Sequence, residues 1–299
     1  MVKIEQISKS FGDVNAVKQC NIEVKEGEMF GIIGPDGAGK TTLIRMITSL
    51  LIPDSGNISL WGLNPVTDYK EVRKMIGYMP GKFSLYMDLT IEENLEFFAT
   101  VFDTTIEENY HLIKDIYQQI EPFKKRPAGK LSGGMKQKLA LSCALIHKPK
   151  LLILDEPTTG VDAVSRKEFW AMLQKLKAAN ITIIVSTPYM DEASLCDRIA
   201  LMQNGEILTI ETPEGIRKNY KKQLLGIKSS KFHKLITDLK AYPQMNSVFP
   251  FGEYLHYTDK SDTTDIDALN KYLGQQGHTD IVIEDIKPDI EDCFMSLMR

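Results

Sequence analysis

The chain has 299 residues, 43% of them hydrophobic and 25% charged, and its formal net charge is -4 at pH 7. This composition is typical of a globular protein, and the slight excess of acid excludes the basic surface expected of a DNA- or RNA-binding protein. The longest apolar runs, such as LLIL at 151–154 and ITIIV at 181–185, have the length of strands. They are far shorter than the roughly 20 residues that cross a bilayer, so we expect no membrane-spanning helix.

The first residues, MVKIEQISKSFG, carry no apolar core behind a basic flank. We therefore expect no secretory signal and a cytoplasmic location. The cysteines are scattered without CxxC spacing, at Cys20, Cys143, Cys196 and Cys293. Free thiols are expected at these positions, rather than a metal site or a disulfide framework.

Short β-branched runs alternate with helix-length segments along the first two thirds of the chain. This alternation predicts an α/β domain with helices on a mainly parallel sheet. Strands are expected at Met29–Ile33, Leu151–Leu154 and Ile181–Ser186, because each is a compact apolar run flanked by turn or acidic residues. Over about 86–146, apolar residues recur at helical spacing behind acidic first turns, which predicts an inserted helical subdomain.

The first of these strands reads into a glycine-rich loop that fits the pattern G-x-x-x-x-G-K-[ST]. The residues of this phosphate loop are Gly34, Pro35, Asp36, Gly37, Ala38, Gly39, Lys40, Thr41 and Thr42. Its backbone N–H groups can wrap a polyphosphate where no Cβ intrudes, and Gly37 and Gly39 supply that clearance. Lys40 is expected to reach the β- and γ-phosphates, and Thr41 to offer its hydroxyl to Mg²⁺. Asp36 is unfavourable beside phosphates unless its side chain points away.

A second block, LLILDEP, is an apolar strand that delivers Asp155 and Glu156 at its carboxyl end, where ligands of open α/β sheets collect. Asp155 is expected to hold Mg²⁺, directly or through water. Shortly before this strand, LSGGMKQKL at 131–139 places another Gly-rich loop at the head of a helix. Together with the phosphate loop, the two acids predict a site for a nucleoside triphosphate.

After about residue 216 these motifs stop, and apolar runs and helical segments follow in an order that predicts a small β-α-β-β-α-β unit. His233, His256 and His278 are isolated in this part of the sequence. None has a metal-ligand neighbour at a useful spacing, so we expect ordinary surface or core histidines and no catalytic group.

From Val2 to Pro213 these blocks, in this order, resemble the nucleotide-binding subunit of an ABC transporter, most closely the drug-exporter branch. The resemblance implies an α/β fold with a phosphate-loop NTPase (RecA-like) core, in an ATPase domain at 1–220 that includes the helical subdomain. It implies a C-terminal α+β accessory domain at 221–299. The ligands implied are ATP and Mg²⁺, and the partners are transmembrane permease subunits and a second ATP-binding subunit. The resemblance implies that this chain is peripheral on the inner face of the cell membrane. The last segment, 287–298, resembles the tail of many exporter ATPase subunits, and we expect a structural or regulatory role for it.

The resemblance also assigns roles to single residues. Glu156 matches the carboxylate that polarises the water attacking the γ-phosphate. Phe11 matches the aromatic residue that stacks on adenine. Asp162 matches the residue that communicates between the two ATP sites of a dimer.

The loop at 131–139 is the feature that separates ABC proteins from other phosphate-loop proteins. In the family it faces the ATP of the opposite subunit in a head-to-tail dimer. The residues that would cap this γ-phosphate are Ser132, Gly133 and Gly134. The segment from Phe83 to Leu95 would pass the motion of the dimer to a permease.

Two positions depart from the family pattern. Gly81 stands where the family keeps a Gln that touches Mg²⁺ and the attacking water, and Pro188 stands where it keeps a His that contacts the γ-phosphate. We therefore expect ATP binding with slow or absent turnover at the chain's own site. The favoured assembly is a heterodimer in which the Ser132 loop completes a competent site on a different ATPase subunit. Two alternatives stay open: a homodimeric exporter ATPase in which Glu156 suffices, and an ABC protein without a transport role.

Overall fold

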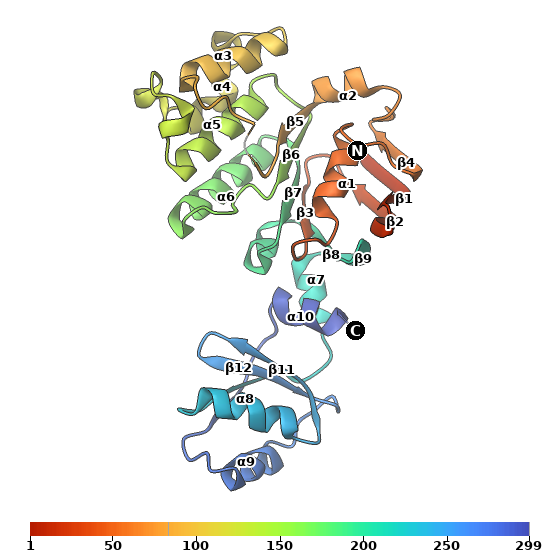
Figure 1. Ribbon diagram of the computed structural model, residues 1–299, viewed down its shortest axis with the longest axis vertical. Helices are drawn as coiled ribbons and strands as arrows, with labels where there is room; N and C mark the ends of the chain where they lie inside the picture. The colour runs from red at the N-terminus through yellow and green to blue at the C-terminus, as the bar shows by residue number, and fades with distance from the viewer. Residues whose placement is uncertain (83, 299) are drawn as a thin grey trace. The chain divides into compact units, whose positions relative to one another are not determined.

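The computed structural model describes residues 1–82 and 84–298, which divide into two compact units (Figure 1). The first unit is Met1–Pro213, and the second begins at Glu214. The assignment of an ATPase domain to 1–220 and of an accessory domain to 221–299 stays a prediction. Among the helices of the described residues, none has both the length and the apolar character that a membrane span requires.

A six-stranded sheet forms the centre of the first unit, and its order is β5-β6-β7-β3-β8-β9. The strands are β3 (Met29–Ile33), β5 (Ile76–Met79), β6 (Leu151–Asp155), β7 (Thr182–Thr187), β8 (Arg198–Gln203) and β9 (Glu206–Glu211). Pairing is parallel from β5 through β8, and β9 joins β8 antiparallel at one edge. Every residue of β3 and β6 is buried, as expected of parallel strands covered on both faces. The three predicted strands correspond to β3, β6 and β7, and the prediction is confirmed.

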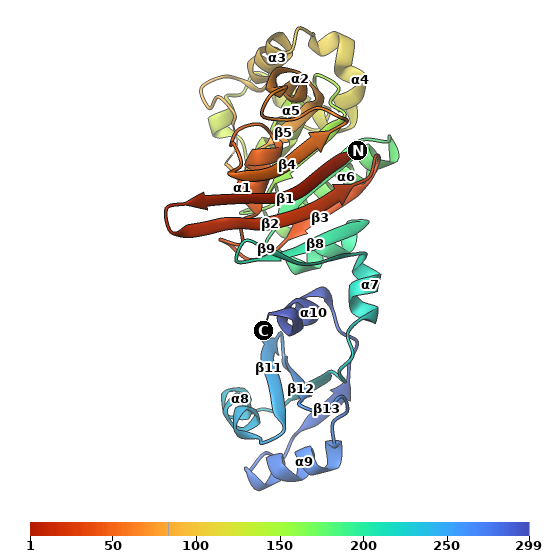
Figure 2. The ribbon, with the colours of Figure 1, turned by 90° about the vertical axis from the view of Figure 1, so that its right-hand side faces the viewer.

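A three-stranded antiparallel sheet with the order β2-β1-β4 completes this unit. Its strands are β1 (Val2–Phe11), β2 (Val14–Val24) and β4 (Ser55–Leu60), and Figure 2 shows β1 and β2 as a long hairpin. Helix α1 (Lys40–Ile47) and both sheets pack around one hydrophobic core. This core contains Ile7 of β1, Leu43 of α1 and Ile153 of β6. This core fixes the hairpin and the start of α1 close to the carboxyl end of β3.

Helices form most of the segment in which a helical subdomain was expected. They are α3 (Ile91–Val101), α4 (Ile106–Tyr117) and α5 (Gly133–Leu145), with the short turns η1 (Glu121–Phe123) and η2 (Ala128–Lys130). Helix α2 (Tyr69–Met75) precedes this segment and leads into β5. Capping boxes begin α3 and α4, with Thr90 paired to Glu93 and Thr105 to Glu108. Helix α5 packs against α3, α4 and β5, and Figure 1 shows this group beside the β5 edge of the sheet. The predicted helices are confirmed.

Two further elements follow the acidic strand β6 and the strand β7. Helix α6 (Ala163–Ala178) connects β6 to β7, and the turn η3 (Met190–Leu195) connects β7 to β8. The carboxyl ends of β3, β6 and β7 therefore lie side by side in one sheet and lead into loops. Ligands of open α/β sheets bind at such an edge.

The second unit contains the predicted β-α-β-β-α-β order. Its elements are β10 (Leu225–Lys228), α8 (Phe232–Ala241), β11 (Met245–Phe251), β12 (Tyr254–Asp259), α9 (Ile266–Gln275) and β13 (Val282–Asp285), with α7 (Pro213–Lys218) before them and α10 (Ile290–Leu297) after them. All neighbours in the sheet β11-β12-β10-β13 are antiparallel, which is a ferredoxin-like arrangement. Leu255 and Tyr257 of β12 pack in the core with α8 and α9. His256, between them, points to the opposite face.

The structure corrects the view that the histidines of this unit are isolated. His233 is exposed, but His256 Nδ1 lies 2.6 Å from Asp292 of α10, and His278 Nε2 lies 2.8 Å from Asp238 of α8. These partners are 36 and 40 residues away along the chain, so no local spacing revealed them. Both histidines are buried, and they stabilise the fold through carboxylate partners.

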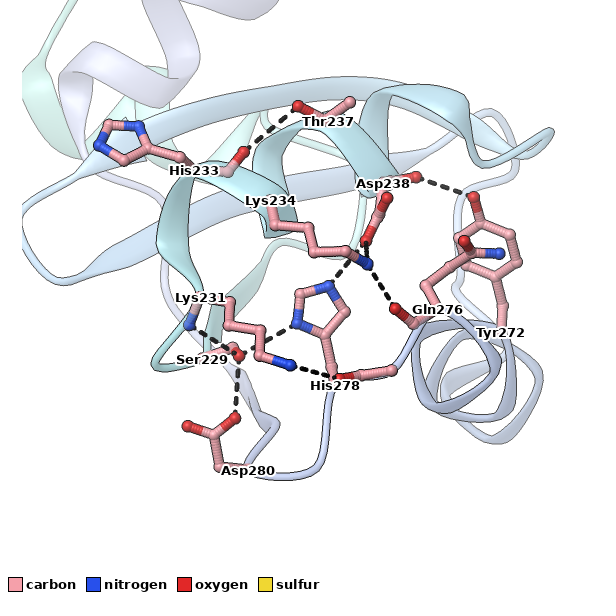
Figure 3. A network of polar contacts seen from close by, with 11 residues as sticks. Ser229, Lys231, His233, Lys234, Thr237, Asp238, Tyr272, Gln276, His278 and Asp280 are labelled. Carbon is pink, nitrogen blue, oxygen red and sulfur yellow. Dashed lines mark hydrogen bonds and ion pairs between the residues drawn. The ribbon is translucent and has the colours of Figure 1, made fainter.

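Figure 3 shows that His278 also contacts Ser229, so that a serine, a histidine and an aspartate lie in a row. This row is not a nucleophilic triad. The Ser229 hydroxyl donates its proton to Asp280, 3.0 Å away, and the side chain of His278 has no exposed surface. The network fastens the start of α8 to the loop after α9.

Candidate nucleotide-binding site

The phosphate loop runs from the end of β3 to the first turn of α1, and three of its glycines are constrained in different ways. Gly37 and Gly39 have φ angles of +78° and +105°, which favour glycine. A Cβ on Gly37 would meet nothing within 4 Å, so this position stays open toward a ligand. A Cβ on Gly39 would lie 2.3 Å from the carbonyl oxygen of Ala16, and one on Gly34 would lie 2.1 Å from that of Met202. Gly34 therefore serves close backbone packing, a role that the sequence pattern did not indicate.

Lys40 is held at the centre of this loop. Its side chain is almost fully buried, and Nζ donates to the carbonyl oxygens of Gly34 at 2.8 Å and Pro35 at 3.0 Å. Glu156 Oε1 lies 3.1 Å from the same Nζ and supplies the countercharge. Lys40 and Glu156, the two residues that the sequence analysis assigned to the γ-phosphate and its attacking water, therefore form an ion pair.

Asp155 and Thr41 come together as the sequence predicted. Asp155 ends β6 and is buried, and Thr41 Oγ1 in the first turn of α1 donates to Asp155 Oδ1 at 3.1 Å. A carboxylate and a hydroxyl oxygen are ligands that suit Mg²⁺. The residues present therefore fit a magnesium site beside the phosphate loop.

A cleft of about 500 Å³ opens in front of these groups. It is lined by the loop from Gly37 to Thr42, by Glu156, by Asp13, Val14, Asn15, Ala16 and Lys18 of the β1–β2 hairpin, and by Asn204 and Gly205 between β8 and β9. Phe11 is 52% exposed and is not among the lining residues, although its register partner Val14 is. Asp36 is exposed and also lies outside the lining, as an acid near phosphates requires. Apart from Phe11, the hairpin carried no sequence signal for this role, and the β8–β9 turn carried none.

The Gly-rich loop at 131–139, called the signature loop below, does not line this cleft. Ser132 caps α5, where its Oγ accepts from the Met135 N–H at 3.3 Å, and Ser132 and Gly133 are exposed. Gly134 is buried, because a Cβ there would lie 2.7 Å from Ser165 Oγ. None of these three residues lines the cleft at the chain's own phosphate loop.

Asp162 caps the next helix, α6. Its Oδ1 accepts from the backbone N–H of Ser165 at 3.0 Å, and this hydrogen bond holds the pKa of the Asp162 carboxyl below its usual value. Because Ser165 also contacts Gly134, the caps of α5 and α6 lie side by side on the surface. Neither cap lines the nucleotide cleft.

Both departures from the family pattern lie at the acidic end of β6. A Cβ on Gly81 would lie 3.1 Å from the carbonyl oxygen of Asp155 and 3.9 Å from Glu156 Cβ. Pro188 directly follows β7, the strand paired with β6. A side chain at either position could approach Glu156, but glycine and proline offer no polar group there.

Sequence reasoning missed a buried carboxylate that braces this end of the sheet. Glu192, in η3, is 3% exposed and accepts from Thr158 Oγ1 at 2.8 Å and Thr187 Oγ1 at 2.5 Å. Thr158 follows the acidic strand and Thr187 precedes Pro188, so Glu192 ties both loops together. Its charged partner, Arg166, is 4.0 Å away. Only the tertiary fold brings these groups together.

Comparison with known proteins assigns the family. Residues 17–159 match the family model described as ABC transporter. A Nod factor export ATP-binding protein I from Rhizobium sp. is 33% identical over 300 residues, which cover 99% of this chain and 96% of that protein. The chain belongs to the ABC transporter family. Its first unit carries the ATP-binding domain of that family.

This ABC chain is also similar to a second curated protein and to a solved ATP-binding cassette. A probable multidrug ABC transporter ATP-binding protein of Escherichia coli, YbhF, is 37% identical over 290 residues, which cover 96% of this chain. The chain spans 50% of the length of that protein. The solved structure of the ATP-binding cassette MJ0796, dimeric and bound to ADP and Pi, superposes with a TM-score of 0.64 at 28% identity. The superposition covers 71% of this chain and 98% of that cassette. The predicted phosphate-loop fold is therefore confirmed.

Proposed function

We propose that this chain is the ATP-binding subunit of a membrane exporter and that it binds Mg²⁺ with ATP in the cleft of the first unit. The observation that carries this proposal is the convergence of Lys40, Thr41, Asp155 and Glu156 on one phosphate loop. The names of the relatives, which include multidrug, Nod factor export and linearmycin resistance proteins, support a role in export.

The roles of the site residues follow from their contacts. Lys40 would exchange its pair with Glu156 for the β- and γ-phosphates, with the amides of the loop from Gly37 to Thr42 around them. Thr41 and Asp155 would hold Mg²⁺, which neutralises phosphate charge when it is bound. Glu156, released from Lys40, would orient the attacking water. Phe11 remains a candidate for stacking on adenine, since it begins the hairpin turn that lines the cleft.

Turnover at this site is proposed to be slow. Gly81 lies beside Asp155 and Glu156, and Pro188 follows β7, and neither residue supplies the polar side chain that the family resemblance expects there. Removing one preorganised group of this kind costs a factor of about 10² to 10³ in the chemical step, and paired losses need not multiply. Binding does not depend on these two positions, because Lys40, Thr41 and Asp155 remain.

The exposed signature loop suggests a division of labour between two subunits. Ser132 and Gly133 sit at the head of α5, exposed and outside the chain's own cleft. In the proposed dimer they would cap the γ-phosphate of a second ATPase subunit, and Asp162 lies beside them on the same surface. We favour a heterodimer in which the other subunit hydrolyses ATP. The intact Glu156 keeps a homodimeric exporter ATPase as the second candidate.

An apolar cleft in the first unit is the proposed contact with a permease on the inner face of the membrane. It has a volume of about 260 Å³ and lies between the sheet edge and the helices, where Leu85, Phe98 and Phe102 line it. Leu50, which also lines it, is 54% exposed and adds an apolar side chain to the surface beside it. Ser84 and Leu85 belong to the segment expected to pass motion to a permease, and Phe83, its first residue, lies outside the described residues.

The test restores both missing groups. ATP binding and phosphate release are measured for the wild-type chain and for Gly81→Gln combined with Pro188→His. A Cβ at position 81 lies 3.1 Å from a backbone oxygen, so the loop must shift by a few tenths of an ångström to admit the side chain. We expect tight binding with negligible release by the wild type, and a rise of at least about tenfold in release by the double variant.

The control is Gly274→Gln, at a position where a Cβ meets nothing within 4 Å, in the second unit. It should leave both binding and release unchanged. Robust turnover by the wild type would refute the impaired site and favour the homodimer. Failure of the wild type to bind ATP would refute the proposed function as a whole.

A further inference from the structure

Ser186 is a small residue that contacts both acidic residues of the site. It is fully buried in β7, where it is the register partner of Asp155 in β6. Its Oγ donates to Asp155 Oδ1 at 2.7 Å and accepts from the Glu156 N–H at 3.0 Å. One hydroxyl therefore joins the metal-binding carboxylate to the backbone of its neighbour.

The two oxygens of the Asp155 carboxylate are used differently. Oδ1 accepts two hydrogen bonds, from Thr41 at 3.1 Å and from Ser186 at 2.7 Å. Within residues 1–82 and 84–298, Oδ2 accepts no hydrogen bond and no cation pairs with this carboxylate. Oδ2 is thus the oxygen left for a metal ion or for its bound water.

The two donors to Oδ1 differ in what they do when Mg²⁺ arrives. Thr41 would offer its oxygen to the ion, which would weaken its hydrogen bond to the carboxylate. Ser186 lies behind the carboxylate on a neighbouring strand and keeps its bond, because its proton has no other acceptor among the described residues. It is then the main hydrogen-bond donor that prevents the carboxylate from rotating.

The backbone of Glu156 needs support as well. Its φ angle is +50°, a left-handed conformation that costs a non-glycine residue about 1 to 2 kcal/mol. The Glu156 N–H donates to both the Oγ and the carbonyl oxygen of Ser186, at 3.0 and 3.1 Å. This pair of acceptors holds the turn that aims the Glu156 carboxylate at Lys40.

We propose that Ser186 is a positioning residue for the metal site: it fixes Asp155 with Oδ2 toward Mg²⁺ and holds Glu156 in its left-handed turn. The inference rests on the proposed function, since it concerns Mg²⁺ bound together with ATP. Groups that orient a metal ligand by a hydrogen bond are worth about 10- to 100-fold in metal affinity.

The experiment measures the Kd of the full-length chain for a fluorescent ATP analogue, MANT-ATP, in EDTA and in saturating Mg²⁺, and the affinity of the ATP complex for Mn²⁺. In Ser186→Ala the gain in affinity from Mg²⁺ should fall by at least about tenfold, while the Kd in EDTA stays within about twofold. Ser186→Cys replaces the hydroxyl with a thiol of similar shape that is a weaker hydrogen-bond donor, so it should lose most of the gain in affinity from Mg²⁺. Ser186→Thr keeps the hydroxyl and should restore the gain.

The matched control is Ser142→Ala, which removes an equally buried hydroxyl whose bond is to the Lys138 carbonyl in α5. It should leave the Mg²⁺ gain unchanged, and thermal denaturation of every variant verifies folding. A Mg²⁺ gain in Ser186→Ala within twofold of wild type, or an equal loss of affinity in EDTA, would overturn the inference and leave the proposed function intact. A wild-type chain that binds no ATP would overturn both.

Discussion

Replacing Glu156 with glutamine should destabilise the nucleotide-free protein and tighten its binding of ATP. Lys40 has 2% of its side chain exposed, and Glu156, with 22% exposed, is its only carboxylate partner among the described residues. The variant leaves the Lys40 charge with two carbonyl oxygens and a neutral amide. ATP would restore the missing negative charge.

The size of the effect follows from the distance. At 3.1 Å the gross attraction between the two charges is about 5 kcal/mol at an effective dielectric constant of about 20. Desolvation offsets most of this, and the carbonyl oxygens remain, so a net loss of about 1 to 2 kcal/mol is expected. For a unit of this size the loss lowers Tm by about 2 to 8 °C. In the wild type, ATP binding must first break the Lys40–Glu156 pair. The variant has no such pair to break, so its ATP binding should be about 5- to 30-fold tighter.

Thermal denaturation with and without ATP, in EDTA to prevent turnover, measures both effects. Saturating ATP should remove most of the Tm difference between wild type and Glu156→Gln. The control is Glu206→Gln, which breaks an exposed pair with Lys18 of similar length and should change Tm by less than about 2 °C. A Tm difference that persists in ATP, or an unchanged Kd for ATP in EDTA, would refute the view that Glu156 holds the place of a phosphate.

Burial lowers the pKa of His147 to about 4, so the folded chain keeps it neutral. Stability should fall as pH drops from about 6.5 to 4, by roughly 3 kcal/mol in all, and His147→Gln should flatten this part of a pH–stability curve measured by urea denaturation. Gly39→Ala should lose nucleotide binding and about 2 to 4 kcal/mol of stability, because the backbone there is left-handed and the added Cβ would also clash with a carbonyl oxygen. Gly37→Ala has the same kind of backbone but free space around its Cβ, so it should lose about 1 kcal/mol. In the second unit, Asp238→Asn should cost about 3 kcal/mol by breaking the pair with buried His278, with no change in ATP affinity measured by fluorescence titration.

Much of the fold could be predicted because its signals are local. The strand Met29–Ile33 and the acidic strand ending at Asp155 are apolar runs with a clear end, and the structure has them at the same residues or one residue further. The six-element order of the second unit follows in the same way from alternating patterns and turn residues. Such patterns are set by burial within one element, so they survive in the sequence.

The parts of the site that escaped prediction depend on how strands pair. Ser186 contacts Asp155 because β7 pairs with β6 in one particular register, and a shift by one residue would turn this hydroxyl to the other face. Glu192 contacts Thr158 across 34 residues, and His256 contacts Asp292 across 36. No spacing rule links such positions. The sequence predicted residues that a ligand would touch, and the structure added those that hold them in place.

The unequal use of the Asp155 oxygens has a consequence for the choice between divalent cations. With Oδ1 engaged by Thr41 and Ser186, this carboxylate can offer one oxygen but not both. Calcium ions favour six to eight oxygens and often take a carboxylate through both of its oxygens, whereas magnesium ions accept single oxygens at the corners of an octahedron. The Ser186 hydroxyl, which lies behind the carboxylate, can thus disfavour the larger ion without touching it.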